Sequence, residues 1–560
     1  MKDKPLHFDP PVVIALAVFI AAFAVLVFYR GLLDHDETRY AEIGREMAER
    51  GNVWEMRLLG FRYYEKPPLT YWLTAAGIAL FGSRDWAARF ALFPSFLLLS
   101  TALWFQARKY WGAERGGWAC LAASTSLLSA LCLLMTDSYL VLWFTLTCLA
   151  LFQVFGREYP SCSVPRSLAA GAFAGLGILT KGLVAFALPL LVLVVWLAWE
   201  RRLNRLFSSR LLWFGAGAMA VLVPCLHLLE QFNPGFNRFF FVSEHLERFL
   251  GKRVIQGHEE PFWFYLQFLP ALLLPWTLFT FRAVKVMARE RALIRDAFSR
   301  FLLVWALVVL IFFSASSGKL ISYILPAIPP LGMLLGRWGV APSPSSGRGD
   351  RLLRAIGWSA VPLIAAVSAG FWLFAYFRVF PDTLGRPSSV SFLAFAPLLV
   401  FMAAAAFVPS WRRRGSLTLL SLSYLAAALV LSPLSGGQFN SSLQLSSRMY
   451  KELENRLEPT DQLVMAEVYR PGLAFYTARR PWLYQVRNEL VFGMEMEPER
   501  EGYLADASAL VEVMRFQAGR WLALVENTDL DNFRKEIAPL QTVLLLQDFH
   551  LAVVEILPAS

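Results

Sequence analysis

The chain has 560 residues, of which 57% are hydrophobic and only 17% are charged, with a formal net charge of +11. Soluble globular proteins have about 45–50% apolar and about 25% charged residues, so this composition excludes an ordinary soluble enzyme. The 46 Phe, 19 Trp and 17 Tyr exclude a disordered chain, which could not keep so many aromatic side chains in water.

Apolar runs recur along the chain, and most approach the length of about 20 residues that a bilayer requires. They predict an α-helical polytopic membrane protein with about 13 transmembrane helices. The first apolar run follows a polar tail and is not followed by a small-residue cleavage site. We therefore interpret it as an anchor helix and not as a removed signal peptide. The predicted spans are 11–29, 86–107, 118–135, 138–155, 168–180, 183–199, 211–229, 262–281, 301–315, 320–335, 355–376, 392–408 and 417–431.

Basic residues in the short loops predict the orientation of these spans. With the N-terminus in the cytoplasm, the inner segments carry 24 basic and 8 acidic residues, a net charge of +16, and the remainder carries −5. The positive-inside rule therefore accounts for the charge, and no nucleic-acid partner is needed. An odd number of spans places the C-terminus on the outer side.

The first outer loop, residues 30–85, contains two predicted helices. Asp34 and Glu37 have the spacing of a capping box before an amphipathic helix over 37–50, which Gly51 should end. The sequence Glu-Lys-Pro-Pro at 65–68 favours an extended segment, because each proline disfavours a helical residue before it. The apolar stretch 69–81 is too short to span comfortably and predicts a helix lying in the membrane interface.

We divide the chain into a membrane domain over 1–436, which includes the outer loops 30–85 and 231–261, and a soluble domain over 437–560. The second is large enough for one small α/β domain outside the membrane. Its patterns predict helices over 443–457 and 508–516, and strands over 463–468, 521–525, 543–546 and 551–556.

Ionisable residues cluster at the outer ends of the spans. Charged groups at membrane depth cost several kcal/mol and are usually retained for function. Acidic, basic and imidazole groups at one membrane face suggest a site for a phosphate carried by a lipid, with Lys, Arg and Tyr as donors to the phosphate. These residues are Asp36, Glu37, Glu65, Lys66, Asp137, Lys181, His245, Arg248, Lys319 and Tyr323.

Each of these residues also has a purely structural interpretation. Asp36 could simply complement the N-terminal dipole of its helix, and Asp137 could cap the helix that follows it. Lys66 and Lys319 could be anchors that extend to the interface. His245, with Glu65 and Asp137, could instead complete a nitrogen and oxygen site for a divalent ion such as Zn²⁺, Mg²⁺ or Mn²⁺.

Five blocks together resemble the signature sequences of the bacterial aminoarabinose transferases, which are members of the protein mannosyltransferase-like GT-C glycosyltransferases. The resemblance covers about residues 30–335, and any one block alone would be weakly specific. The soluble tail is similar only in size and position. The blocks are DHDETRYAEIGREM, RYYEKPPLTYWL, LLMTDS, FFFVSEHLERFLG with GHEEPFWFYL, and SGKLISYILPAIPPL.

The resemblance implies a bacterial inner-membrane enzyme with a periplasmic active site and C-terminal domain. It would move 4-amino-4-deoxy-L-arabinose from undecaprenyl phosphate to a lipid A phosphate. Asp36, with Glu37 beside it, corresponds to the catalytic acid block. The resemblance further implies metal ligands at Glu65, Asp137 and His245, and lipid-phosphate contacts at Lys66, Arg248 and Tyr323, with Arg253 as a second candidate for the arginine. Lys319 is a further candidate for a phosphate contact because of its position at the start of a span, beside Tyr323.

Three other functions remain open from the sequence. A related transferase could use another polyprenyl-phosphate sugar, such as mannose, on protein Ser/Thr or another envelope acceptor. A flippase for a lipid-linked sugar should carry charges near mid-span, whereas the charges here lie at one face. A membrane scaffold with a soluble binding domain would leave the Glu-Lys-Pro-Pro block unexplained.

Overall fold

The computed structural model describes most of the chain as two compact units, and each unit is described by itself. Unit 1 comprises residues 1–27, 92–225 and 251–433, and unit 2 comprises 28–91, 226–250 and 434–560. The residues described are 20, 23, 24, 27, 28, 31–127, 132–156, 163–247, 260–273, 276–316, 318–340, 443–486, 489–497, 501–548 and 550–558.

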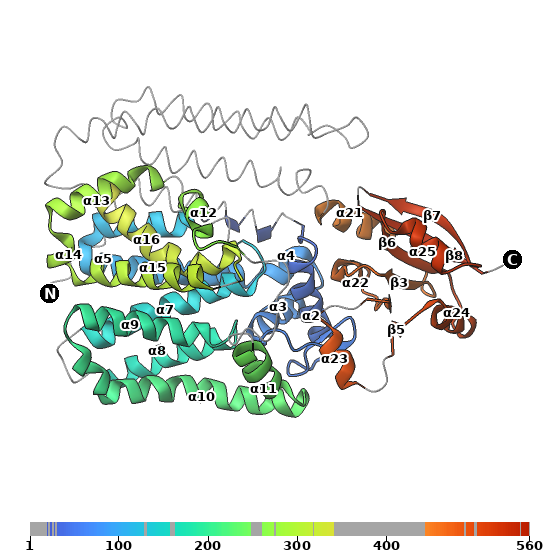
Figure 1. The fold of residues 1–560 in the computed structure, drawn as a ribbon, viewed down its shortest axis with the longest axis horizontal. Helices are drawn as coiled ribbons and strands as arrows, with labels where there is room; N and C mark the ends of the chain where they lie inside the picture. Colours follow the sequence, from blue (N-terminus) through green and yellow to red (C-terminus); the bar gives the residue numbers. More distant parts are fainter. Residues whose placement is uncertain are drawn as a thin grey trace, which may run out of the picture. The chain divides into compact units, whose positions relative to one another are not determined.

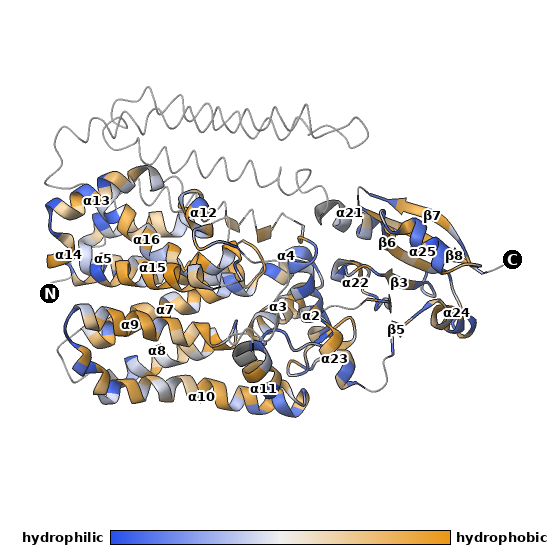
Figure 2. Ribbon diagram, in the orientation of Figure 1, coloured by the Kyte–Doolittle hydropathy of each residue, from blue (hydrophilic) through white to orange (hydrophobic). Residues whose placement is uncertain are grey.

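Unit 1 is helical throughout its described residues, and its helices α9, α10 and α15 are apolar along most of their length (Figures 1 and 2). Helix α7 packs against α8 and α9, and α15 packs against α9 and α16. The elements are α5 (Leu92–Ser126), α7 (Thr136–Gly156), α8 (Ser163–Ile178), α9 (Val184–Trp199), η1 (Leu203–Phe207), α10 (Ser209–Phe232, which ends in unit 2), α12 (Phe264–Leu272), η3 (Trp276–Phe279), α13 (Thr280–Arg289), α14 (Ala292–Arg295), α15 (Ala297–Ala315), η4 (Ile321–Ala327), α16 (Ile328–Leu334) and η5 (Leu335–Val340).

Four stretches of described helix are long and apolar enough to cross a membrane, namely Asp85–Ser126, Thr136–Gly156, Ser209–Phe232 and Ala297–Ala315. The predicted spans 138–155, 168–180, 183–199, 211–229 and 301–315 are confirmed as helices, with ends that differ by a few residues. The spans 355–376, 392–408 and 417–431, and most of 11–29, lie outside the described residues. The number 13 therefore stays a prediction.

Helix α5 is a hairpin of two helices, as the predicted spans 86–107 and 118–135 require. Gly112 interrupts it with a φ of 82°, a conformation that costs little only for glycine. Beyond this turn the chain runs back along itself, because a Cβ on Gly116 would lie 2.6 Å from the backbone nitrogen of Arg108. The Ser124 hydroxyl likewise donates to the Ser100 hydroxyl at 3.0 Å.

Two predicted spans are helical, but neither is a single α-helix within the described residues. Residues 262–281 divide among α12, η3 and the start of α13, and residues 320–335 form the 3₁₀ helix η4 followed by α16. Pro270 lies inside α12 and Pro326 inside η4. Proline lacks the backbone N–H that α-helical hydrogen bonding needs, and its ring crowds the preceding turn. Each proline lies within two residues of the end of its element, α12 at Leu272 and η4 at Ala327.

Both helices predicted within residues 30–85 are present, and they belong to unit 2. They are α2 (Asp36–Arg50) and α3 (Leu69–Phe81), separated by the short hairpin β1 (Arg57–Leu58) and β2 (Phe61–Arg62) and followed by α4 (Asp85–Arg89). Gly51 ends α2 in a left-handed conformation, as predicted. The predicted capping box is wrong: His35 occupies the N-cap position, and Asp34 instead accepts hydrogen bonds from the hydroxyls of Thr38 and Tyr450, each at 2.8 Å.

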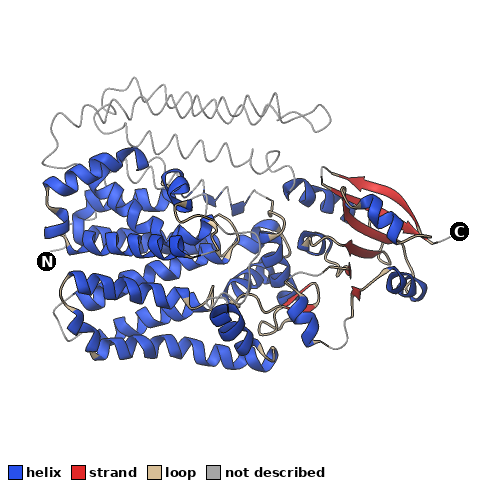
Figure 3. Cartoon of the chain, viewed as in Figure 1, coloured by secondary structure: helices blue, strands red, loops and turns tan. Residues whose placement is uncertain are grey.

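The C-terminal part of unit 2 contains a six-stranded sheet in the order β5-β4-β3-β6-β8-β7 (Figure 3). Strands β5, β4, β3 and β6 are parallel, and β8 and β7 are antiparallel to their neighbours. The predicted strands and helices are confirmed within a few residues; the start of the predicted domain at 437 lies outside the described residues. The elements are α21 (Leu443–Glu454), β3 (Gln462–Ala466), α22 (Pro471–Thr477), β4 (Trp482–Tyr484), α23 (Val491–Met496), β5 (Tyr503–Leu504), α24 (Ala507–Phe516), β6 (Trp521–Glu526), α25 (Leu530–Glu536), β7 (Gln541–Gln547) and β8 (Leu551–Leu557).

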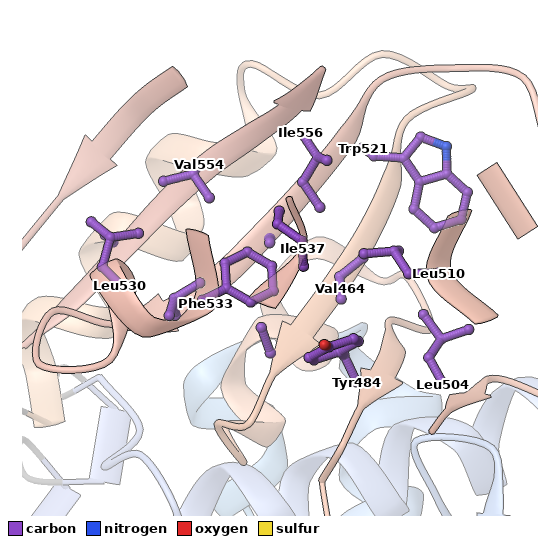
Figure 4. Packing of buried hydrophobic residues seen from close by; sticks show 14 residues of the cluster. Val464, Tyr484, Leu504, Leu510, Trp521, Leu530, Phe533, Ile537, Val554 and Ile556 are labelled. Carbon is purple, nitrogen blue, oxygen red and sulfur yellow. The ribbon is translucent and has the colours of Figure 1, made fainter. Parts of the chain in front are cut away.

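One face of this sheet packs on a hydrophobic core (Figure 4). Val464, Tyr484 and Val554 from the strands contact Leu510 of α24 and Phe533 of α25, and all are buried. In β3 the four residues after the first are buried, which is typical of a central parallel strand. Unit 2 also contains α11 (Phe236–Arg238) and the π-helix η2 (Phe239–Glu247).

Candidate functional site

The two predicted catalytic acids occupy the first turn of α2 in different environments. The Asp36 side chain is 65% exposed, and its Oδ1 accepts a hydrogen bond from Arg39 Nη2 at 2.9 Å. Glu37 is buried, accepts a hydrogen bond from the backbone nitrogen of Leu33 at 2.8 Å, and lies 3.8 Å from Arg89 Nη1. Only Asp36 therefore offers an accessible carboxylate, whereas Glu37 stabilises the chain entering the helix.

Arg39 links Asp36 to the C-terminal part of unit 2. Its Nη1 donates to both carboxylate oxygens of Glu489, at 2.9 and 2.7 Å. Glu489 also accepts hydrogen bonds from the Tyr469 hydroxyl at 2.6 Å and the Tyr63 hydroxyl at 3.3 Å. This cluster of a largely buried carboxylate, a guanidinium and two phenols is joined to the exposed acid through Arg39.

Glu65 and Lys66 precede α3, as the Glu-Lys-Pro-Pro block predicts. Lys66 Nζ lies 3.7 Å from Glu65 Oε2 and donates to the Glu65 carbonyl at 3.1 Å. The Glu65 side chain is 15% exposed and the Lys66 side chain is 26% exposed. The positive charge of Lys66 also contributes to the lowered pKa of Glu489, after Arg39 and Tyr469. Lys66 therefore belongs to the electrostatic surroundings of the Arg39–Glu489 pair.

A second cluster of predicted site residues lies in unit 1, around Asp137 in the first turn of α7. Lys181 Nζ donates to Asp137 Oδ1, and the Ser322 hydroxyl donates to Oδ2 at 3.1 Å. The Lys181 ammonium also lies 4.3 Å from the centre of the Tyr323 ring. Lys181, whose spacing in the sequence indicates no role, is the partner of Asp137.

Lys319 is not an extended surface anchor. It is 5% exposed, and its Nζ donates to the backbone carbonyls of Glu260 at 2.6 Å and Ser316 at 2.5 Å. These bonds hold together the chain segments that precede α12 and η4. A contact between Lys319 and a lipid phosphate stays a prediction.

For three of the predicted residues the structure describes no side chain. Arg248 and Arg253 are among them, and for His245 only the backbone, in η2, is described. The other predicted residues divide between the units: Asp36, Glu37, Glu65 and Lys66 belong to unit 2, and Asp137, Lys319 and Tyr323 belong to unit 1.

The described carboxylates do not fit a metal site by themselves. Each of the two acids predicted as ligands has a lysine beside it, Lys66 for Glu65 and Lys181 for Asp137, and a cation would have to displace or tolerate these ammonium groups. Within the described ranges, no group of three or more His, Cys, Asp or Glu side chains is arranged to hold an ion. A divalent metal at Glu65, Asp137 and His245 stays a prediction, and we derive no chemical step through it.

Nothing in the sequence around Glu489 and Tyr469 marks them as partners of Arg39. Both lie more than 400 residues from Arg39 in the chain, in a region without a recognisable catalytic motif. The one available signal was Arg39 itself, a charged residue three positions after Asp36 and therefore on the same side of the helix. A guanidinium on a largely buried helix needs a compensating partner, but the position of Arg39 in the sequence does not identify which residue that partner is.

Comparison with known proteins identifies similar sequences along most of the chain. The profile of the family described as dolichyl-phosphate-mannose-protein mannosyltransferase matches residues 65–228. An undecaprenyl phosphate-alpha-4-amino-4-deoxy-L-arabinose arabinosyl transferase 2 of Pseudomonas fluorescens (strain Pf0-1) is 34% identical over 57% of this chain and 58% of its own length. A second such transferase from the same strain is 29% identical over 86% of this chain and 83% of its own length.

The fold is also similar to that of a solved structure. ArnT from Cupriavidus metallidurans bound to undecaprenyl phosphate matches with a TM-score of 0.76 and 27% sequence identity, over 97% of both chains. The apo state of the same protein matches with a TM-score of 0.75 over the same shares of the chains. The predicted combination of a polytopic helical region with a small C-terminal α/β domain is confirmed.

Proposed function

We propose that the chain is a protein mannosyltransferase-like GT-C glycosyltransferase that transfers 4-amino-4-deoxy-L-arabinose from undecaprenyl phosphate to a phosphate of lipid A. The observation that carries the proposal is the match over 97% of both chains to a protein solved with undecaprenyl phosphate. The aligned part of the first relative is only 58% of that protein, so the full-length structural match carries more weight.

In this proposal the protein is a multi-pass protein of the bacterial inner membrane with a cytoplasmic N-terminus. The first outer loop and the C-terminal domain are periplasmic. The basic inner loops support this orientation, since the inner segments carry a net +16 and the remainder −5. The acids and lysines at the outer ends of the spans would then face the donor and acceptor lipids.

The chemistry of the acceptor limits what Asp36 does. A phosphate monoester has a second pKa of about 6, so it is largely ionised near neutral pH and needs little help from a base. Its oxygen attacks the anomeric carbon as the bond from that carbon to the donor phosphate breaks, and undecaprenyl phosphate leaves with the bonding electron pair. Asp36 would position the acceptor or stabilise positive charge on the sugar, while cationic side chains stabilise the departing phosphate.

A second candidate is favoured by the mannosyltransferase profile over residues 65–228. In this case a polyprenyl-phosphate sugar such as mannose would be transferred to a protein hydroxyl. A Ser or Thr hydroxyl is not ionised at neutral pH, so Asp36 would then act as a true general base.

Mass spectrometry of lipid A from cells with and without this chain tests the proposal. We expect lipid A to gain the mass of one aminoarabinose only in cells that contain the chain. Lipid A that is identical in both strains, together with glycosylated protein in the first, would overturn the first candidate in favour of the second.

Lys66→Ala and Tyr323→Phe are expected to weaken donor binding before they affect turnover. Hydrogen bonds to charged groups contribute about 1.5–3 kcal/mol, so the apparent KM for the lipid donor should rise about 10- to 100-fold in Lys66→Ala. Tyr323→Phe keeps the ring that contacts Lys181 and removes only the hydroxyl. KM should be measured with purified protein in nanodiscs and varied donor.

Lys451→Ala is the matched control for Lys66→Ala. Lys451 belongs to the same unit and has one acidic partner, Asp85, at 2.8 Å. The Lys451→Ala variant should have the same KM for the donor as the unmodified protein. Equal KM values in all of these variants and the unmodified protein would remove Lys66 and Tyr323 from the phosphate site.

A further inference from the structure

Glu489 is a buried carboxylate that the proposed reaction does not use directly. It lies just before α23, its side chain is 19% exposed, and it accepts two hydrogen bonds from Arg39 Nη1 and one each from Tyr469 and Tyr63. Tyr63 is 1% exposed. An unpaired carboxylate in such a place would be costly, so this degree of partnering indicates a charge held at a defined position.

Both members of the Arg39–Glu489 pair remain charged at neutral pH. Burial by itself would raise the pKa of Glu489, but the adjacent Arg39 and the Tyr469 hydroxyl bond leave it lowered. The pKa of Tyr469 is raised well above its ordinary value by burial and by the negative charge of Glu489, so its hydroxyl keeps the proton that it donates. The donors and acceptors of the cluster therefore do not change between pH 6 and pH 8.

Arg39 transmits this fixed position to Asp36. The guanidinium group is planar and rigid, so anchoring Nη1 on Glu489 also sets the direction of Nη2. Nη2 donates to Asp36 Oδ1 at 2.9 Å. Among the residues that the structure describes, Arg39 is the only one that donates a hydrogen bond to the Asp36 side chain, which is otherwise 65% exposed.

We propose that Glu489 is a positioning residue for sugar transfer: it holds the Arg39 guanidinium, which in turn aims the Asp36 carboxylate. The C-terminal region would then complete the site at α2 and would not be an independent binding module. This inference rests on the proposed function, because the role of Asp36 in transfer comes from it.

A purely structural link between Glu489 and α2 would make a different prediction. It would stabilise the fold, and its loss would reduce the amount of folded protein without changing turnover per folded molecule. A positioning role lowers kcat in the folded fraction while donor binding stays nearly unchanged, because the interaction matters most when the acceptor reacts. A positioning role is therefore recognised by a lower kcat of the folded protein at an unchanged KM, whereas a structural role changes only the amount of folded protein.

The test uses full-length protein in nanodiscs and the variants Glu489→Gln, Tyr469→Phe and the double variant Arg39→Lys/Glu489→Gln. Glu489→Gln preserves size and removes the charge, and we expect kcat to fall about 10- to 100-fold, with the KM for the donor within about threefold of the unmodified value. Tyr469→Phe removes a single hydroxyl and should lower kcat about 3- to 10-fold. It keeps the test informative if Glu489→Gln does not fold.

Arg39→Lys alone completes a double-mutant cycle. If Glu489 acts through Arg39, the double variant should be scarcely slower than the slower single variant, whereas independent effects would multiply. Asp461→Asn is the matched control, because it removes another arginine-paired carboxylate of the C-terminal region, which lies 2.7 Å from Arg520. It should leave kcat unchanged.

Amide hydrogen exchange supplies a readout that does not depend on the substrate. Peptides that cover residues 33–45 should exchange faster in Glu489→Gln and Tyr469→Phe than in the unmodified protein or in Asp461→Asn. Unchanged exchange and unchanged kcat would overturn the positioning role. An unmodified protein that forms no aminoarabinose-lipid A would overturn the proposed function instead, whatever the exchange data show for Glu489.

Discussion

Asp36→Asn is expected to abolish sugar transfer and to leave the protein folded. The side chain is 65% exposed and its one described ion pair is with Arg39, three residues away, so its contribution to stability is small, as for most exposed pairs. Removing a carboxylate that acts in the transition state typically slows a reaction by about 10²- to 10⁴-fold. Transfer should be measured with purified protein, and folding by its melting temperature in detergent.

Asp531→Asn is a closely matched control for this substitution. Asp531 also lies in the first turn of a helix, α25, and pairs at i,i+3 with Arg534 at 3.3 Å, with 84% of its side chain exposed. Both variants remove an exposed acid from the first turn of a helix. Turnover should be unchanged in Asp531→Asn, and near-normal turnover in Asp36→Asn would refute a catalytic role for Asp36.

Breaking the Asp137–Lys181 pair is expected to have the largest effect on stability. The two side chains are 8% and 15% exposed, and removing one partner of a buried pair costs about 3–5 kcal/mol because the other charge is left without compensation. Asp137→Asn and Lys181→Met should each lower the melting temperature in detergent. The double variant should recover much of that loss and remain inactive, since both charges are absent.

The same variants decide whether Asp137 serves mainly as an ion-pair partner or as a metal ligand. If a divalent ion were its main partner, Lys181→Met would be mild. Chelation of the unmodified protein would then lower the melting temperature as far as Asp137→Asn does, and elemental analysis would detect a bound metal. Glu200→Gln is the control, because Glu200 pairs with Arg300 and both side chains are 12% exposed. It should lower the melting temperature without reducing turnover per folded molecule.

Much of the fold could be predicted because its signals are local. The helix over 69–81 was predicted with the bounds that the structure has, and the left-handed Gly51 ends α2 as expected. The strand patterns at 521–525 and 551–556 appear as β6 and β8. Apolar periodicity and turn residues act between neighbours in the chain, so they can be interpreted without knowledge of distant contacts.

The errors arose where a local signal was overlooked or had two solutions. Pro270 and Pro326 lie in spans predicted as single α-helices, whereas α12 ends two residues after Pro270 and the helix that contains Pro326 is a 3₁₀ helix continuing into α16. Asp34 had the spacing of a capping residue, but Thr38 and Tyr450 donate to its side chain. The Tyr450 hydroxyl comes from a helix more than 400 residues away in the chain. The spacing of residues around Asp34 cannot reveal such a distant donor.

Local sequence patterns were enough to indicate the membrane class, the concentration of basic residues in alternate loops, most of the described helices and strands, and the candidate acids. The tertiary structure decided which charges are paired: Lys181 with Asp137, and Glu489 with Arg39. The second pair joins residues 450 positions apart. The physical reason is that a buried charge requires a compensating partner, while the chain folds so that the partner can come from any segment brought within about 4 Å.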